Sequence, residues 1–162
     1  MIGERARPPG TSDGSAGAIP GAGGGLGGGH RGPLPYSDVI RQRWRRPAFR
    51  GPLPGATAVA EDVNPLCGDR VRMAFVLDDG LIAAARFVGD SCAICTASAD
   101  ILAEKVLART VPDALAVTTN TLLEALDADI RPTRMRCVTL PLSVLQTALG
   151  PFAGAPAREG GP

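Results

Sequence analysis

The residues of this sequence best suited to chemistry are three of its four cysteines, because each lies beside an expected boundary between secondary-structure elements. Cys67 lies in a loop with Asn, Pro and Gly, Cys92 directly follows Gly-Asp-Ser, and Cys137 follows Arg-Met-Arg. A thiol at the start of a helix lies at the positive end of the helix dipole, which favours the thiolate. Because the thiolate binds metals and attacks sulfur, we interpret these cysteines as chemically active. The alternative is that all four cysteines are small core residues.

The spacing of the cysteines excludes two common arrangements. A zinc ribbon needs two close pairs of cysteines, and only Cys92 and Cys95 form such a pair. A thioredoxin-like redox motif needs a parallel sheet, whereas the strands expected before Cys92 form an antiparallel hairpin. What remains is a set of scattered ligands: Cys67 and Asp69 in one loop, completed by Cys92 and Cys137. Such a set suits zinc or iron, and its carboxylate, a harder ligand than sulfur, predicts a site that releases its cargo.

Charge and composition exclude several other classes of function. The chain has 162 residues, with 17 basic and 16 acidic side chains, so it is not a strongly basic nucleic-acid-binding protein. Its one histidine, His30, lies in a glycine-rich segment, which argues against a Ser-His-Asp or Cys-His enzyme. No apolar run approaches the about 20 residues that cross a membrane, and no secretory signal is recognisable. We therefore expect a cytoplasmic protein whose cysteines are reduced.

Composition also divides the chain. Residues 1–35 contain 12 of the 21 glycines and 5 of the 15 prolines, and such a segment buries too little apolar surface to fold. We expect a disordered Gly/Pro-rich tail at 1–35 and a second disordered tail at 151–162. The remaining residues, 36–150, are long enough for one folded domain with a modest core.

Periodicity predicts the elements that position the cysteines. Alternating apolar residues predict an antiparallel hairpin with its turn at Asp79 and Gly80, and helical spacing places Cys92 at the start of a helix. Because proline is tolerated only in a first helical turn, Pro141 predicts that the last helix begins at or just after Cys137. The expected strands are 57–63, 71–77 and 81–88, and the expected helices are 36–46, 92–107, 112–126 and 138–149. The first helix carries a basic face that we expect to be solvated: Arg41, Arg43, Arg45 and Arg46.

Three segments together resemble a known family. Residues 64–70 (Asn-Pro-Leu-Cys-Gly-Asp-Arg), residues 87–92 (Phe-Val-Gly-Asp-Ser-Cys) with Ala-Ser-Ala at 97–99, and residues 132–137 (Pro-Thr-Arg-Met-Arg-Cys) occur in the family's order. On these motifs, the sequence is similar to the U-type iron-sulfur cluster scaffolds, which comprise SufU, IscU and the N-terminal domain of NifU. The resemblance covers residues 36–150.

The resemblance implies both a fold and a function. The fold is α+β, with a small antiparallel sheet of about three strands covered by helices. The implied ligands are Cys67, Asp69, Cys92 and Cys137, which hold a transient [2Fe-2S] cluster or a zinc ion. The implied role is that of a scaffold, not an enzyme, which accepts persulfide sulfur from a cysteine desulfurase and delivers clusters to apo iron-sulfur proteins. Two alternatives stay open: a zinc-bound sulfur acceptor that stimulates the desulfurase, and a zinc-stabilised interaction domain.

The sequence also departs from the family pattern. Arg136 stands before the third cysteine where the Isc branch has histidine, and residues 130–134 replace its chaperone motif, which places the chain nearer SufU. The short separation of Cys92 and Cys137 is instead that of the Isc branch. Cys95 replaces a residue that is commonly small, one helical turn from Cys92, and is interpreted as a spare ligand, a sulfur relay or a bystander thiol. Arginines near the ligands, among them Arg131 and Arg134, are available for partner docking.

Overall fold

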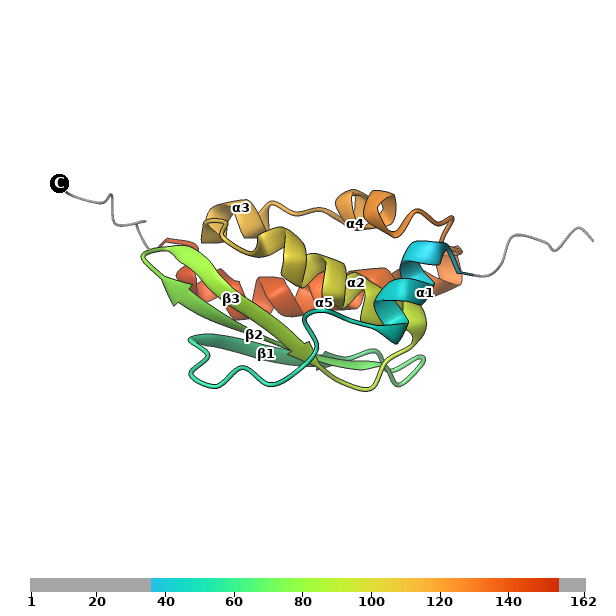
Figure 1. The fold of residues 1–162 in the computed structure, drawn as a ribbon, viewed down its shortest axis with the longest axis horizontal. Coiled ribbons are helices and arrows are strands. Elements are labelled where there is room, and N and C mark those ends of the chain that lie inside the picture. The colour runs from blue at the N-terminus through green and yellow to red at the C-terminus, as the bar shows by residue number, and fades with distance from the viewer. Residues whose placement is uncertain (1–35, 155–162) are drawn as a thin grey trace, which may run out of the picture. The chain divides into compact units, whose positions relative to one another are not determined.

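The computed structural model describes residues 36–154, whose centre is a three-stranded antiparallel sheet (Figure 1). Its strands are β1 (Ala58–Val63), β2 (Arg70–Asp78) and β3 (Leu81–Val88), in the order β1-β2-β3. The turn between β2 and β3 is the expected one, since Asp79 and Gly80 both have a positive φ, of 50° and 77°. The predicted α+β class with a small antiparallel sheet is confirmed.

One face of the sheet is buried because apolar residues alternate along its strands. Val71, Met73 and Phe75 of β2 are at most 1% exposed, and Ile82 and Phe87 of β3 lie on the same face. The helices α2 (Ala93–Val106) and α5 (Met135–Leu149) pack on this face, α2 against β3 and α5 against β1 and β2. Figure 1 shows the helices gathered on this one side of the sheet.

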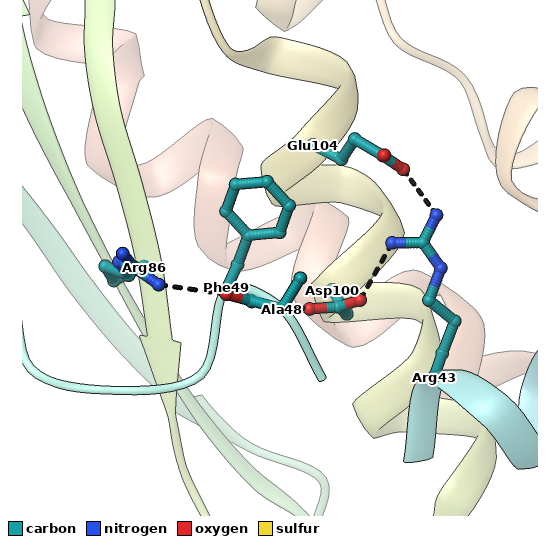
Figure 2. Close-up of polar contacts among 6 residues, drawn as sticks. All are labelled: Arg43, Ala48, Phe49, Arg86, Asp100 and Glu104. Atoms are coloured by element: carbon teal, nitrogen blue, oxygen red, sulfur yellow. Dashed lines mark hydrogen bonds and ion pairs between the residues drawn. The ribbon is translucent and has the colours of Figure 1, made fainter. Parts of the chain in front are cut away.

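The first helix, α1 (Asp38–Arg45), begins at Ser37, whose side chain accepts a hydrogen bond from the Ile40 N–H. Its basic face is only partly solvated, contrary to expectation. The Arg43 guanidinium donates to the Asp100 carboxylate at 2.9 Å and also pairs with Glu104, both on α2 (Figure 2). Asp100 is fully buried, so the ion pair with Arg43 ties α1 to α2.

The segment after α1 is held by the same buried carboxylate. The backbone N–H of Phe49 donates to the second oxygen of Asp100 at 2.8 Å. On the other side, Arg86 of β3 donates to the Ala48 carbonyl at 2.9 Å (Figure 2). Asp100 therefore organises the crossing between α1 and the sheet, because both of its oxygens are occupied by groups from this crossing.

The helix predicted over 112–126 is two helices, α3 (Val111–Leu115) and α4 (Thr119–Leu126). The break occurs because Thr118 has an extended backbone and its hydroxyl accepts from the Thr121 N–H, which starts a new helix. Both helices contact α2 and α5. They form an outer layer over α2 and α5, and α4 buries Leu122 and Leu126.

The last helix begins earlier than expected. A 3-10 turn, η1 (Pro132–Arg134), leads into α5 at Met135, so Pro141 lies inside the helix rather than in its first turn. Pro141 has no N–H to donate to the Cys137 carbonyl four residues earlier. The helix continues because it is buried along its length, with Val138, Val144 and Leu145 in the core.

The folded chain extends past the expected boundary at residue 151. A second 3-10 turn, η2 (Gly150–Phe152), follows α5, and Phe152 packs against the core. The rest of the expected tails, 1–35 with His30 and 155–162, lies outside the described residues. Within residues 36–154, no helix has the length and apolar character needed to span a membrane.

Candidate metal centre

The first segment of the site is the loop between β1 and β2. Buried Asn64 closes this loop, because its N–H donates to the Asp69 carbonyl at 2.7 Å and its carbonyl accepts from the Gly68 N–H at 2.8 Å. Its side-chain oxygen also accepts from the Leu66 N–H at 3.1 Å. Gly68 has a φ of 77°, in the left-handed region that glycine adopts readily. The loop thus presents Cys67 to solvent and turns Asp69 inward.

The second segment runs from the end of β3 into α2. Gly89 has a φ of 154°, and a Cβ at this position would lie 2.0 Å from the Arg70 carbonyl oxygen, so only glycine fits. The Arg70 N–H donates to the Asp90 carbonyl at 2.9 Å, which ties this segment to the start of β2. Cys92 is the N-cap of α2, and its own N–H donates to Asp69 Oδ1 at 2.9 Å.

The third segment is the start of α5. Cys137 lies in the first turn of this helix and is 2% exposed. The side chains of Cys92 and of the exposed Arg134 lie near enough to its thiol to influence its charge. Arg134 is therefore the cationic neighbour of the thiols.

These three segments converge. A Cys67 sulfur, an Asp69 carboxylate oxygen and the Cys137 sulfur all lie within 4.8 Å of one another. Cys92 adjoins this group through its backbone N–H, which donates to Asp69 Oδ1. The structure therefore brings Cys67, Asp69 and Cys137 together and places the backbone of Cys92 beside them, whereas the Cys92 sulfur is not among the ligand atoms that lie within 4.8 Å of one another. Because zinc holds thiolates at about 2.3 Å and carboxylates at about 2.0 Å, ligand atoms this close need only a small inward movement to share an ion.

The Asp69 carboxylate provides the observation that tests whether a cation fits. Oδ1 accepts from Cys92, but Oδ2 is buried and has no hydrogen-bond partner among residues 36–154. A buried oxygen without a partner is costly, and a bound cation supplies one. The donor set of three thiols and one carboxylate suits zinc or iron, so the residues present fit such a group.

The family model described as "NifU-like N terminal domain" matches residues 35–159. The chain belongs to the NifU-like N-terminal domain family. A relative in Thermotoga maritima, "Iron-sulfur cluster assembly scaffold protein IscU", is 33% identical over 78 residues, covering 48% of this chain and 55% of the relative. In Bacillus subtilis, "Zinc-dependent sulfurtransferase SufU" is 32% identical over 82 residues, covering 51% of this chain and 55% of the relative. The chain thus spans about half the length of these curated relatives.

A solved structure agrees with this assignment. The putative iron-sulfur cluster assembly scaffold protein for the SUF system of Fervidobacterium islandicum AW-1 superposes with a TM-score of 0.63 at 28% identity. The match covers 70% of this chain and 96% of that structure. The resemblance to U-type scaffolds inferred from the three motifs is confirmed.

In this NifU-like domain, the pKa values of the Cys92 and Cys137 thiols are higher than their positions at the starts of helices predict. Burial raises the pKa of Cys92, and burial together with the neighbouring Cys92, Asp69 and Cys67 raises the pKa of Cys137 to about 12. The expected shift toward thiolate is therefore wrong for the site without a cation. There are two causes. Burial removes water from Cys92 and Cys137, and the negative charges of neighbouring thiolates and of the Asp69 carboxylate repel one another.

Sequence reasoning missed the residues that hold the ligands in place. Asn64 and Gly89 contribute no ligand, yet the first closes the Cys67 loop and the second allows the Cys92 loop to lie against β2. The signal for both was present, since each lies a few residues before a ligand inside a motif of this NifU-like domain. For Gly89 the sequence did not show which backbone group it meets, because Arg70 lies in a separate segment of the chain; the partners of Asn64, by contrast, all lie within the next five residues.

Proposed function

We propose that this protein is an iron-sulfur cluster scaffold, which assembles a [2Fe-2S] cluster on Cys67, Asp69, Cys92 and Cys137 and transfers it to apo-proteins. The observation that carries the proposal is the approach of Cys67, Asp69 and Cys137 to within 4.8 Å, with the Cys92 N–H bonded to Asp69. The membership of the NifU-like family and the relatives named IscU and SufU support the same function.

Sulfur arrives as a persulfide from a cysteine desulfurase. Cys92 and Cys137 are the candidate first acceptors, because each lies at the start of a helix that borders the site. Arg134 beside Cys137 stabilises an anionic sulfur there. Partners approach the exposed side of the site, where Leu66 is 85% exposed and Arg131 and Arg136 are also exposed.

Asp69 is the ligand that keeps the cluster transferable. A carboxylate binds iron less tightly than a thiolate, so the cluster leaves most readily from this corner of the site. Asp69 also fixes the position of Cys92 through its Oδ1. Asp69 thus weakens the binding of the cluster and also holds Cys92 in place.

Anaerobic reconstitution with iron, inorganic sulfide and a desulfurase tests the proposal. We expect wild-type protein to develop the visible absorption of a [2Fe-2S] cluster, and Cys67→Ser, Cys92→Ser and Cys137→Ser each to lose it by at least about tenfold. Asp90→Ala, which removes an exposed carboxylate two residues before Cys92, is the matched control and keeps the absorption. If the three serine variants reconstitute as well as wild type, the cluster does not reside at this site.

A zinc-bound sulfur acceptor is the second candidate, favoured by the relative named as a zinc-dependent sulfurtransferase. The same four residues hold the ion in this case, and the ion keeps their sulfurs as thiolates. This function predicts tightly bound zinc in protein purified anaerobically, faster desulfurase turnover in its presence, and no cluster absorption on reconstitution. A zinc-stabilised interaction domain instead predicts that desulfurase turnover is indifferent to the protein while chelation unfolds it.

A further inference from the structure

The start of α2 carries two thiols rather than one. Cys92 is the N-cap, and Cys95 is the third residue of the helix. The Cys95 N–H points at the Cys92 sulfur, 3.5 Å away, so the Cys92 side chain already lies over the residue that bears the second thiol. Neither is in a disulfide.

The backbone permits a bond between these two sulfurs. Residues three apart on a helix have Cβ atoms about 5 to 6 Å apart, whereas a disulfide needs about 3.5 to 4.5 Å. The difference is absorbed at the N-cap, where Cys92 has an extended backbone (φ −66°, ψ 169°) and is not bound by helical geometry. Closing the bond therefore requires a local adjustment of Cys92 and leaves the body of α2 unchanged.

The backbone of Cys95 lies beside the Cys92 sulfur, and the Cys95 thiol is shielded from solvent. Its side chain is fully buried, and it does not belong to the group formed by Cys67, Asp69 and Cys137. A fully buried thiol does not meet a desulfurase or a soluble oxidant directly. The sulfur of Cys92, by contrast, lies over the first turn of the same helix and is only half-buried.

We propose that Cys95 discharges sulfur from Cys92 as sulfide, an inference that rests on the proposed sulfur-accepting function. The Cys95 sulfur attacks the Cys92 Sγ of a persulfide, a Cys92–Cys95 bond forms, and the bond from Cys92 Sγ to the outer sulfur breaks. The outer sulfur leaves with the bonding electron pair and takes up the Cys95 proton as hydrogen sulfide. It is reduced by two electrons, which the two cysteines supply together as they become a disulfide.

The step gives the site an internal source of reducing electrons. A persulfide delivers sulfur at the wrong oxidation level for a cluster, which contains sulfide. The Cys92–Cys95 pair provides the two electrons once, and a dithiol reductant of the thioredoxin type restores both thiols for the next turn. While the disulfide exists, Cys92 is not available as a ligand, so discharge and cluster binding alternate at this residue.

Variants that isolate the pair provide the test. The double variant Cys67→Ser/Cys137→Ser of the 162-residue chain retains only Cys92 and Cys95 of the four cysteines. It is loaded with persulfide by inorganic polysulfide, freed of excess reagent and followed without reductant. We expect release of one sulfide per persulfide on Cys92, together with a Cys92–Cys95 disulfide in the mass spectrum. Adding Cys95→Ser, or Cys95→Ala in case a buried hydroxyl disturbs folding, should leave the persulfide on Cys92 with no sulfide release.

Equal persistence or equal loss of the persulfide with and without Cys95 overturns the proposal. Mapping the disulfide in polysulfide-treated wild-type protein repeats the test without the serine substitutions. A parallel loading of wild-type protein with a cysteine desulfurase and cysteine separates this proposal from the proposed function. If polysulfide loads Cys92 and discharge follows, but the desulfurase loads neither Cys92 nor Cys137, sulfur acceptance fails while the chemistry of the pair stands.

Discussion

Replacing Gly89 by alanine should do more damage than any other single methyl group added to the two ligand loops. The new Cβ would lie 2.0 Å from the Arg70 carbonyl oxygen and 3.1 Å from the Val71 Cα. Cβ contacts under 3.0 Å are essentially never seen, and both neighbours are backbone, so neither turns aside. The loop must therefore move away from β2 by about the missing 1 Å, and Cys92, three residues later, moves with it.

The magnitude follows from two contributions. A φ of 154° is unfavourable for alanine, which costs roughly 1 to 2 kcal/mol. Separating the loop from β2 also stretches the Arg70 N–H bond to the Asp90 carbonyl and the Cys92 N–H bond to Asp69, each worth about 1 kcal/mol or more when its partner stays buried. We expect Gly89→Ala to lower the free energy of unfolding by about 3 to 4 kcal/mol.

Two other glycines provide matched controls for urea unfolding. Gly68, in the Cys67 loop, also has a positive φ of 77°, but a methyl group added there would meet no atom within 4 Å, so Gly68→Ala should cost only about 1 kcal/mol. Gly150 has a helical backbone and open space, so Gly150→Ala should be neutral or slightly stabilising. Zinc titration of the folded variants should show weaker binding for Gly89→Ala than for Gly68→Ala. If Gly89→Ala and Gly68→Ala unfold at the same urea concentration, close packing of the loop on β2 does not hold Cys92.

Three further predictions concern the carboxylates and thiols. Asp69→Ala should bind zinc about tenfold more weakly, as measured by competition with a chelator. The same variant should retain a reconstituted cluster longer during transfer to an apo-ferredoxin, because the weakest ligand has been removed. Faster loss of the cluster would contradict the role of Asp69 as the weak ligand. Without metal, stability should fall as pH rises from about 9 towards 12, because folded Cys137 keeps its proton to a pKa of about 12 while an unfolded thiol loses it near about 8.5. Cys137→Ser should flatten this decline in urea titrations at several pH values. Asp100→Ala should cost about 2 to 4 kcal/mol in urea unfolding, whereas Arg41→Ala, at an exposed ion pair, should change stability by less than about 0.5 kcal/mol.

Local patterns predicted the sheet well because its signals are local. Met73 and Phe75 alternate with polar or small neighbours, and the turn at Asp79 and Gly80 needs only two residues to specify it. The break between α3 and α4 at Thr118 was not predicted, because the local apolar pattern does not reveal it. Apolar spacing continues across the break, and the competing signal is one hydroxyl that caps the next helix.

At Pro141, the packing of the helix outweighs the local preference of proline for a first helical turn. The rule that proline belongs in a first helical turn placed the helix start at or after Cys137, whereas α5 starts at Met135. A proline in a helix interior costs roughly 3 kcal/mol, and burial of a single Leu or Val contributes about 1.5 to 3 kcal/mol. Val138, Val144 and Leu145 are all fully buried, so packing of α5 offsets the lost hydrogen bond.

The residues of the candidate site could be singled out from the sequence, and the ligand atoms of three of them converge, but their electrostatics could not be predicted. Three motifs in order identified Cys67, Asp69, Cys92 and Cys137, because each motif carries its ligand within a few residues. The direction of the thiol pKa values was not predictable. It depends on how closely groups from three distant segments approach and on how far burial removes water from them.

The way the ligand segments are attached to the fold suggests how the site opens. The Cys67 and Cys92 loops are tied to each other at the start of β2, through the Arg70 N–H bond to Asp90 and the Cys92 N–H bond to Asp69. Cys137 lies on a separate element, α5, and its carbonyl lacks the usual helical hydrogen bond because Pro141 has no N–H to donate. A movement that separates Cys137 from the other ligands therefore breaks fewer backbone bonds than one that separates the two loops. For the proposed scaffold, we therefore expect the cluster to enter and leave between α5 and the paired loops, on the side of Arg134, whose charge interacts with the Cys137 thiol.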